Sequence, residues 1–457
     1  MNIRRWKHTL PALTRGGLCG LFLAFSASMG RAAEQASVPP PAPPQEVLRL
    51  DEAIRISLDN QPRIQAALGK VGSQNALLGQ QFSAYYPTIT ESNSYRDSTS
   101  SGSGDSVSAR ARDRFNGQAT MNMTLYNFGK REGTVQSARE SLEAANQDYK
   151  TVINDVILAV KQAYFSYLQA AALVKVREET VKGRELLVRQ ARAFYEVGTR
   201  PRIDVARAEA NLYSAQADLI AAQNAVKVAW TVLKNAMGTP DLPERSLAEE
   251  LTMVAFSMTL EEAKAAAFAA RPELHSFEAQ RRAQDQKIAA ARRGHLPDIL
   301  FTGSYGRTGS SPSDFGPGRS PAFPLQPFWT AQLSLNIPIF DGFNTTYKVE
   351  EAVKTYYTIK AQEETQKQQV ALDVEQSYLR LLEARERIKA TEAGERAAKE
   401  NLDLANGRYQ VGVGSIIEVT DAQTLYTSAE TDRIRSLYDY KIFEAQLARA
   451  VGSGVSP

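Results

Sequence analysis

Cysteine and histidine are scarce in this chain of 457 residues, and their scarcity excludes several kinds of chemistry. The one cysteine is Cys19, within the first 33 residues, and only His275 and His295 follow that segment. Neither histidine is near a candidate nucleophile in sequence, and no glycine-rich loop between a strand and a helix is present to hold a phosphate. We therefore expect no enzyme activity, no cofactor and no metal site, and no disulfide after residue 33.

Long hydrophobic runs are also rare. The stretch GLCGLFLAFSA lies near the start, after Arg4, Arg5 and Lys7 and before several small residues. This order is typical of a secretory signal peptide, which we assign to residues 1–33. No later segment has the roughly 20 consecutive apolar residues of a membrane-spanning helix, so any membrane crossing is expected to use strands. A lipid on Cys19 is a minor alternative, because the apolar run follows this residue instead of preceding it.

Basic charge is scarce once the predicted signal is removed. Cleavage near Ala32 or Ala33 removes five basic residues and no acidic one, so the formal net charge falls from +3 to −2. Nucleic-acid binding requires a concentrated basic face, so we expect no nucleic-acid partner.

What the chain does have is an internal duplication. The stretch YEVGTRPRIDVARAEANLYSAQADLIAAQ from Tyr195 matches YQVGVGSIIEVTDAQTLYTSAETDRIRSL from Tyr409 at a constant offset of 214 residues, and Pro62 aligns with Pro272 near the start of each copy. Each repeat predicts a helix, a β-hairpin, a very long helix, a short loop and a helix. The predicted parts are a signal peptide (1–33), a proline-rich linker (34–47), a first repeat (48–240, hairpin 88–125), a link (241–258), a second repeat (259–452, hairpin 298–340) and a tail (453–457).

The predicted strands alternate between apolar and polar residues. RFNGQATMNMTLYNFGKR and FWTAQLSLNIPIF each give one apolar and one polar face, as in a transmembrane strand, whose apolar side chains contact lipid. Half-buried strands of a soluble sheet are the alternative. The expected lipid-facing residues are Met121, Met123, Leu125, Trp329, Leu333, Leu335 and Ile337.

Four strands are too few to close a barrel, because the smallest transmembrane barrels have about eight. Several copies of the chain must then contribute, and the strand count alone allows either a dimer or a trimer. The helices carry a heptad stripe that includes Tyr149, Val156 and Val188, which is typical of helices packed side by side. The segments 130–195 and 345–409 would each be about 100 Å long at 1.5 Å per residue.

The duplicated YxVG turns, the NQP and ARP helix openings, and the LYNFGK and PIFDGF strand exits resemble the TolC family of outer-membrane efflux proteins. The resemblance covers about residues 47–452. It implies a mainly α protein with a transmembrane β-barrel: a homotrimer with a 12-stranded barrel in the outer-membrane lipid, continuous with a long α-helical barrel in the periplasm. It also implies a passive exit duct that works with a periplasmic adaptor (membrane fusion protein) and an inner-membrane pump, in efflux or in type I secretion.

The resemblance further implies an aperture at the periplasmic end, near the second turn. Glu418 and Asp421 match an acidic pair, Tyr409 matches a tyrosine that ties the helices together, and Asp204 follows the first turn. The alternative role for these acids is an interaction with the helix dipole, worth roughly 0.3 to 1 kcal/mol. Where the family often has threonine and arginine, the second turn has Val413 and Gly414, and the basic residue, Arg200, is in the first turn. The resemblance therefore carries no gating salt bridge over to the second turn.

The two turns are the expected adaptor contacts, because they are the ends of the helices furthest from the predicted strands. Their residues are Val197, Gly198, Thr199, Arg200, Val411, Gly412, Val413 and Gly414. Three rival interpretations are a periplasmic coiled-coil adaptor without its own barrel, a simple porin and a periplasmic hydrolase. Adaptors have one helical hairpin and porins have few helices, while a hydrolase would need a catalytic constellation.

Overall fold

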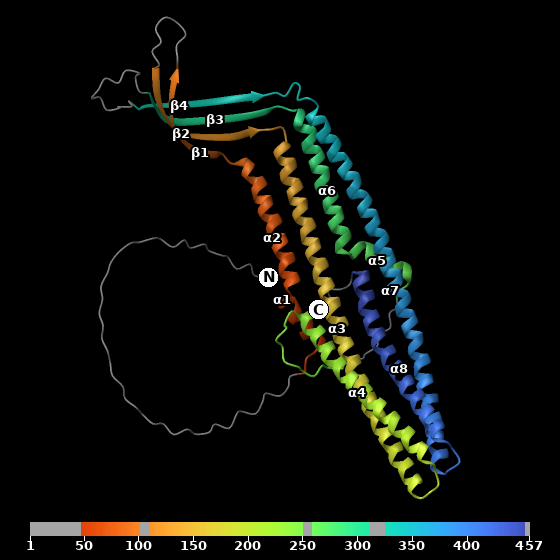
Figure 1. The fold of residues 1–457 in the computed structure, drawn as a ribbon. Coiled ribbons are helices and arrows are strands. Elements are labelled where there is room, and N and C mark those ends of the chain that lie inside the picture. Colours follow the sequence, from red (N-terminus) through yellow and green to blue (C-terminus); the bar gives the residue numbers. More distant parts are fainter. Residues whose placement is uncertain (1–46, 101–109, 250–257, 311–324, 453–457) are drawn as a thin grey trace, which may run out of the picture. The chain divides into compact units, whose positions relative to one another are not determined.

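The computed structural model describes residues 47–100, 110–249, 258–310 and 325–452. The predicted signal peptide and the C-terminal tail lie outside these residues, as do residues 34–46 of the proline-rich linker, the centres of both hairpin loops and residues 250–257 of the link between the repeats. Within the described residues the chain repeats one order of elements (Figure 1).

The first repeat contains α1 (Leu50–Asn60), α2 (Pro62–Phe82), β1 (Thr88–Ser100), β2 (Arg110–Tyr126), α3 (Lys130–Glu196) and α4 (Arg202–Met237). The second contains α5 (Leu260–Ala270), α6 (Pro272–Arg292), β3 (Asp298–Ser310), β4 (Gln326–Asn336), α7 (Asn344–Gln410) and α8 (Ile416–Val451). The short 3-10 turns Ser83–Tyr85 and Arg293–His295 precede β1 and β3. Both α3 and α7 have 67 residues, close to the predicted bounds of the long helices.

The expected opening helix of each repeat is in fact two helices. The break falls at Gln61 (φ −69°, ψ 117°) and at Arg271 (φ −73°, ψ 122°), and a proline follows each of these residues. A proline ring disfavours helical backbone in the residue before it, so the chain turns there and starts again with proline at the first helical position. The sequence prediction of one helix per opening was wrong in this respect.

The four strands form one antiparallel sheet in the order β1-β2-β3-β4, so within the chain β1 and β4 are its edges. The register aligns Met121 with Gly303 and Ile89, and Met123 with Phe301, which in turn faces Leu333. On the other face, Thr90, Thr120, Ser304 and Thr330 form one row, and the Ser304 and Thr330 hydroxyls are 2.5 Å apart. The sheet therefore has one mostly apolar face and one face lined largely by hydroxyl and amide groups.

Two expected strand residues depart from regular pairing. The strand β4 ends at Asn336, so Ile337 is outside it, and the reason is Pro338, which has no N–H group to donate to the next strand. Leu125 is in β2 but falls in a β-bulge, because the pairing with β3 shifts between Thr124 and Tyr126. Trp329, Leu333 and Leu335 are exposed on the apolar face, whereas Met121 and Met123 are half-buried.

The helices pack around α3, which contacts α2, α4, α6 and α8. One apolar core joins α1, α3 and α4 and includes Tyr164 and Trp230, and a second joins α5, α7 and α8 and includes Val370 and Leu447. The link between the repeats is attached to the first core, because Leu48 pairs with Leu247 in a parallel bridge and the Tyr164 hydroxyl is 3.0 Å from the Leu48 carbonyl oxygen.

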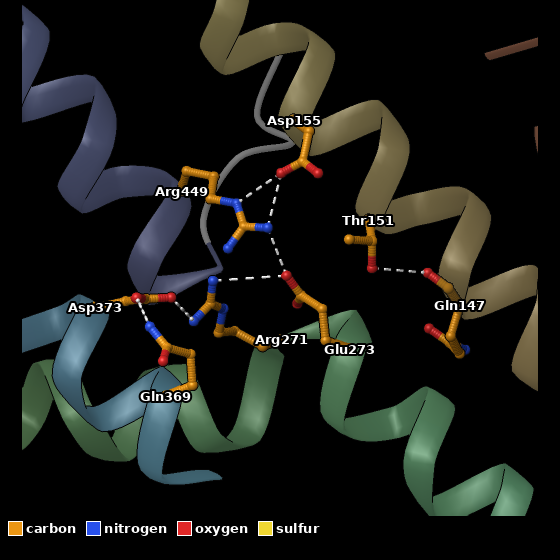
Figure 2. Close-up of polar contacts among 8 residues, drawn as sticks. All are labelled: Gln147, Thr151, Asp155, Arg271, Glu273, Gln369, Asp373 and Arg449. Carbon is orange, nitrogen blue, oxygen red and sulfur yellow. Dashed lines mark hydrogen bonds and ion pairs between the residues drawn. The ribbon is translucent and has the colours of Figure 1, made fainter. Parts of the chain in front are cut away.

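A network of charged side chains connects the two repeats (Figure 2). Arg449 of α8 is 2.7 Å from Asp155 of α3 and 2.6 Å from Glu273 of α6. Arg271, only 1% exposed, is 3.5 Å from Glu273 and 3.2 Å from Asp373 of α7. Burial raises the pKa of Asp155, while the nearby Arg63 and Arg271 lower it by a smaller amount.

One described helix, α3, is long enough and locally apolar enough to be considered as a membrane span. Of the apolar stretch of α3, 44% is buried against the rest of the chain, as in the core helix of a soluble protein, so this is weak evidence of a span.

Candidate functional site

Two turns lie at the ends of the long helical hairpins: residues 197–201 join α3 to α4, and residues 411–415 join α7 to α8 (Figure 1). These turns and the helical residues that contact them are called the hairpin ends. Both turns have the same hydrogen-bond pattern: Gly198 N–H donates to Tyr195 O and Gly412 N–H to Tyr409 O, at 2.9 and 3.1 Å. Gly198 (φ 75°) and Gly412 (φ 86°) have the left-handed backbone that commonly ends a helix at glycine. Pro201 is the residue immediately before α4.

An apolar core holds the hairpin ends together. It includes Leu187 and Ala191 of α3, Ala208 of α4, Ala405 and Tyr409 of α7, and Ile416 and Val419 of α8. The helices α3, α4, α7 and α8 thus all contribute to one cluster, and the turns of the two repeats lie side by side.

Arg200 connects the first turn to the second. Its Nη2 atom donates to the carbonyl oxygens of Gly412 and Gly414, at 2.9 and 2.6 Å. Gly414 is buried, and a Cβ atom there would be 2.9 Å from the backbone nitrogen of Tyr409, so a larger residue would not fit without a backbone shift. The sequence alone located the basic residue in the first turn but did not identify these carbonyl partners.

Tyr409 is buried beneath the second turn. Its side chain is 1% exposed, its ring packs edge-on against Phe194 at 5.5 Å between centroids, and the Arg200 guanidinium carbon is 5.5 Å from the ring centre. Its hydroxyl has no hydrogen-bond partner in the described part of the chain. Burial raises the pKa of Tyr409, the charge of Asp204 raises it further, and Arg200 opposes both. Tyr409, Asp204 and Arg200 therefore belong to one cluster.

The acidic pair on α8 is separate from this cluster. Glu418 and Asp421 are exposed and three residues apart, so they share one side of the helix. The Arg408 Nε atom donates to Glu418 Oε2 at 3.3 Å, and the Glu418 backbone N–H donates to the Ser415 side chain that caps α8. Asp421 has no ion pair within 4.0 Å among the described residues. Glu418 is therefore partly neutralised within its own hairpin, and Asp421 is not.

Most of the expected adaptor-contact residues are accessible in the single chain. Val197, Val411 and Val413 are among the most exposed large apolar side chains of the helical part. Gly198, Thr199 and Gly412 are exposed as well, whereas Arg200 is half-buried and Gly414 is buried. The last two residues contribute to the contact between the turns more than to their outer surface.

The family model described as "Outer membrane efflux protein" matches residues 53–239 and 265–453, one segment in each repeat. Among similar proteins, Protein CyaE of Bordetella pertussis is 27% identical over 446 residues, which cover 91% of this chain and 86% of the relative. Outer membrane protein TolC of Vibrio cholerae is 26% identical over 325 residues, covering 70% and 73%. The solved structure of the CmeC outer membrane channel of Campylobacter jejuni has the same fold, with a TM-score of 0.77, 19% identity, and coverage of 89% of this chain and 86% of that one. The chain therefore belongs to the outer membrane efflux protein family.

Proposed function

We propose that three copies of this chain form the exit duct of a tripartite export system, which conducts cargo from an inner-membrane pump across the periplasm and the outer membrane. Membership of the efflux channel family supports an outer-membrane protein whose helical part lies in the periplasm. The assembly of three copies, the partnership with a pump and an adaptor, and the roles of the gating residues are what we propose beyond family membership.

The observation that carries the proposal is the sheet. It has an exposed apolar face, an opposite face lined largely by hydroxyl and amide groups, and two edge strands, β1 and β4, each with one edge unpaired among the described residues. Unpaired strand edges are not tolerated within a bilayer, where only a closed barrel satisfies every backbone group. Edge pairing of β1 with β4 of the next copy would close the barrel, with the apolar face toward lipid.

The helices favour the same assembly. Within the chain α4 packs mainly on α3, and its outer surface carries exposed apolar side chains. These are Ile203, Tyr213, Ile220, Val228 and Val232. Such a stripe is costly in water and typical of a helix that packs against a partner. A second copy would cover it and continue the wall of the helical barrel.

We further propose that the hairpin ends form the aperture of the duct. In the trimer, Glu418 and Asp421 of each copy would surround one constriction, and concentrated negative charge in a narrow pore favours cations. Tyr409, Asp204 and Arg200 would hold the two hairpins of each copy together beneath it. Opening would be a change in the packing of these ends, with energy supplied by the pump.

The exposed turn residues are the proposed adaptor contacts. Val197, Thr199, Val411 and Val413 offer apolar and hydroxyl surface at the ends of the hairpins, and Gly198 and Gly412 leave the backbone accessible. Loss of export on substitution of these residues, with assembly and membrane insertion retained, would support the contact.

The alternative of a periplasmic adaptor is not favoured, because the matching family consists of channels and the sheet exposes a broad apolar face. Insertion into planar bilayers tests the proposed function. The protein from the outer-membrane fraction is expected to give discrete, long-lived conductance steps. A protein that stays in the aqueous periplasmic fraction and gives no conductance would contradict the proposal.

A further inference from the structure

A polar cavity of about 350 Å³ lies between α3, α4 and α8. Its lining includes Arg184 and Thr180 of α3, Asn211 of α4 and Thr424 of α8. It also brings together equivalent positions of the two repeats, because Asp218 and Asp432 are 214 residues apart and both line it. Equivalent positions of the two repeats therefore line the same cavity, to which the proposed duct function assigns no role.

Arg184 is the buried charge of this cavity. Its side chain is 6% exposed, and its Nη2 atom donates to the Thr424 hydroxyl at 2.9 Å and to the Thr420 carbonyl oxygen at 3.4 Å. Its Nη1 atom is buried and has no hydrogen-bond partner in the described part of the chain. Burial lowers the pKa of Arg184, and the charge of Asp421 acts in the opposite direction without forming an ion pair.

Arg271, the other buried arginine among the described residues, provides a comparison. It is 1% exposed and has the carboxylates of Asp373 and Glu273 at 3.2 and 3.5 Å. Arg184 has only neutral acceptors, and no carboxylate of the described residues lies within 4.0 Å of it. A buried charge without an opposite charge is unfavourable, so a counterion is expected near Arg184.

A second donor in the same cavity is also unsatisfied. The Asn211 Nδ2 atom is buried without a partner, and together with Arg184 Nη1 it makes up the unsatisfied buried side-chain atoms among the described lining residues. Both atoms are donors, and neither reaches an acceptor among the described residues. The acidic residues that line it, Asp218 and Asp432, are exposed, and Arg177 and Arg435 also line the cavity. The volume is well above the roughly 30 Å³ that a water molecule takes in the liquid.

We propose that this cavity binds a small oxyanion, a phosphate or a carboxylate, through Arg184 Nη1 and Asn211 Nδ2. Charge-assisted hydrogen bonds from a guanidinium suit the planar carboxylate and the tetrahedral phosphate alike. The anion supplies the countercharge that Arg184 lacks and links α3 to α4 and α8 above the hairpin ends.

Calorimetric titration of the full-length protein in detergent tests this proposal, with inorganic phosphate in one series and acetate in a parallel series at constant ionic strength. Saturable binding of one anion per chain is expected in at least one series, and the series that saturates identifies the class of anion. Arg184→Gln is expected to weaken binding at least tenfold. The matched control is Arg192→Gln on the same helix, an exposed arginine paired with Glu209, which should leave binding unchanged. No saturable binding in either series, or equal loss in both variants, would overturn the proposal.

Asn211→Asp keeps the proposal testable if Arg184→Gln does not fold. It adds a carboxylate to the cavity lining and is expected to abolish anion binding while raising the melting temperature. The rival counterion is the side chain of Asp421. If that residue served the role, Asp421→Asn would lower the melting temperature as much as Arg184→Gln and the unmodified protein would bind no anion, which would contradict the proposal.

Discussion

Arg200 and Gly414 occupy equivalent positions in the two repeats, 214 residues apart, and the guanidinium of Arg200 donates to the carbonyl oxygen of Gly414 at 2.6 Å. The duplication has thus diverged into a complementary pair. One copy supplies a long cationic donor, and the other supplies a residue without a side chain, which leaves its carbonyl accessible. A similar divergence separates Tyr409, 1% exposed, from its equivalent Tyr195, 46% exposed.

Arg200→Ala is expected to loosen the hairpin ends. It removes the donor to two carbonyl oxygens and the cation beside the Tyr409 ring. The measurement is the distance distribution between spin labels attached at Val197→Cys and Val411→Cys, which should broaden or lengthen. Arg202→Ala, an exposed neighbour, is the control. An unchanged distribution in Arg200→Ala would show that this contact does not hold the turns together.

Tyr409→Phe is expected to remove an alkaline sensitivity of the hairpin ends. Burial favours the neutral phenol, so the folded-state pKa of Tyr409 is above its ordinary value of 10.0. The stability that comes from the neutral, buried phenol of Tyr409 is fully present below pH 10 and is lost as pH rises through the folded-state pKa. Because the hydroxyl has no partner among the described residues, Tyr409→Phe should cost little at pH 7. Hydrogen exchange of the turn amides at pH 8 to 11, compared with the unmodified protein at matched intrinsic rates, checks both expectations.

Glu418→Ala combined with Asp421→Ala is expected to reduce cation selectivity, since two carboxylates per copy leave the proposed constriction. The measurement is the reversal potential in a planar bilayer under a KCl gradient. Arg408→Ala is the matched opposite change, because it frees Glu418 from its ion pair and should increase cation selectivity. Equal reversal potentials in the unmodified protein, the double variant and Arg408→Ala would show that Glu418 and Asp421 do not form an acidic ring at the constriction.

Arg271→Gln is expected to destabilise the protein by about 3 kcal/mol, because removing one member of a buried ion pair leaves the other unpaired. Asp373 would lose this partner, while Glu273 would keep Arg449 (Figure 2). Arg282→Gln, which breaks a more exposed pair with Glu140, should cost less than about 1 kcal/mol. Chemical denaturation of the two variants measures the difference in the free energy of unfolding. Equal losses of stability would show that the buried ion pairs of Arg271 contribute no more than an exposed pair.

The sequence predicted the elements better than it predicted contacts between them. The heptad stripe and the glycine turns located α3 and α7 to within a residue or two, because helical period and helix ends are local properties. The helix breaks before Pro62 and Pro272 and the strand end before Pro338 are also local effects of proline, whereas the sequence prediction gave one helix at the start of each repeat. The donation from Arg200 to Gly414 was not predictable, since it depends on how the two hairpins pack. The burial of Tyr409, in contrast to the exposure of its equivalent Tyr195, also depends on how the two hairpins pack.

The mass of the detergent-solubilised protein from the outer-membrane fraction, corrected for bound detergent, tests the central claim most directly. The account predicts three chains per particle, with β1 of one copy paired to β4 of the next. A water-soluble monomer would contradict it, because the apolar face of the sheet would then have no lipid to contact and its edges no partner strands.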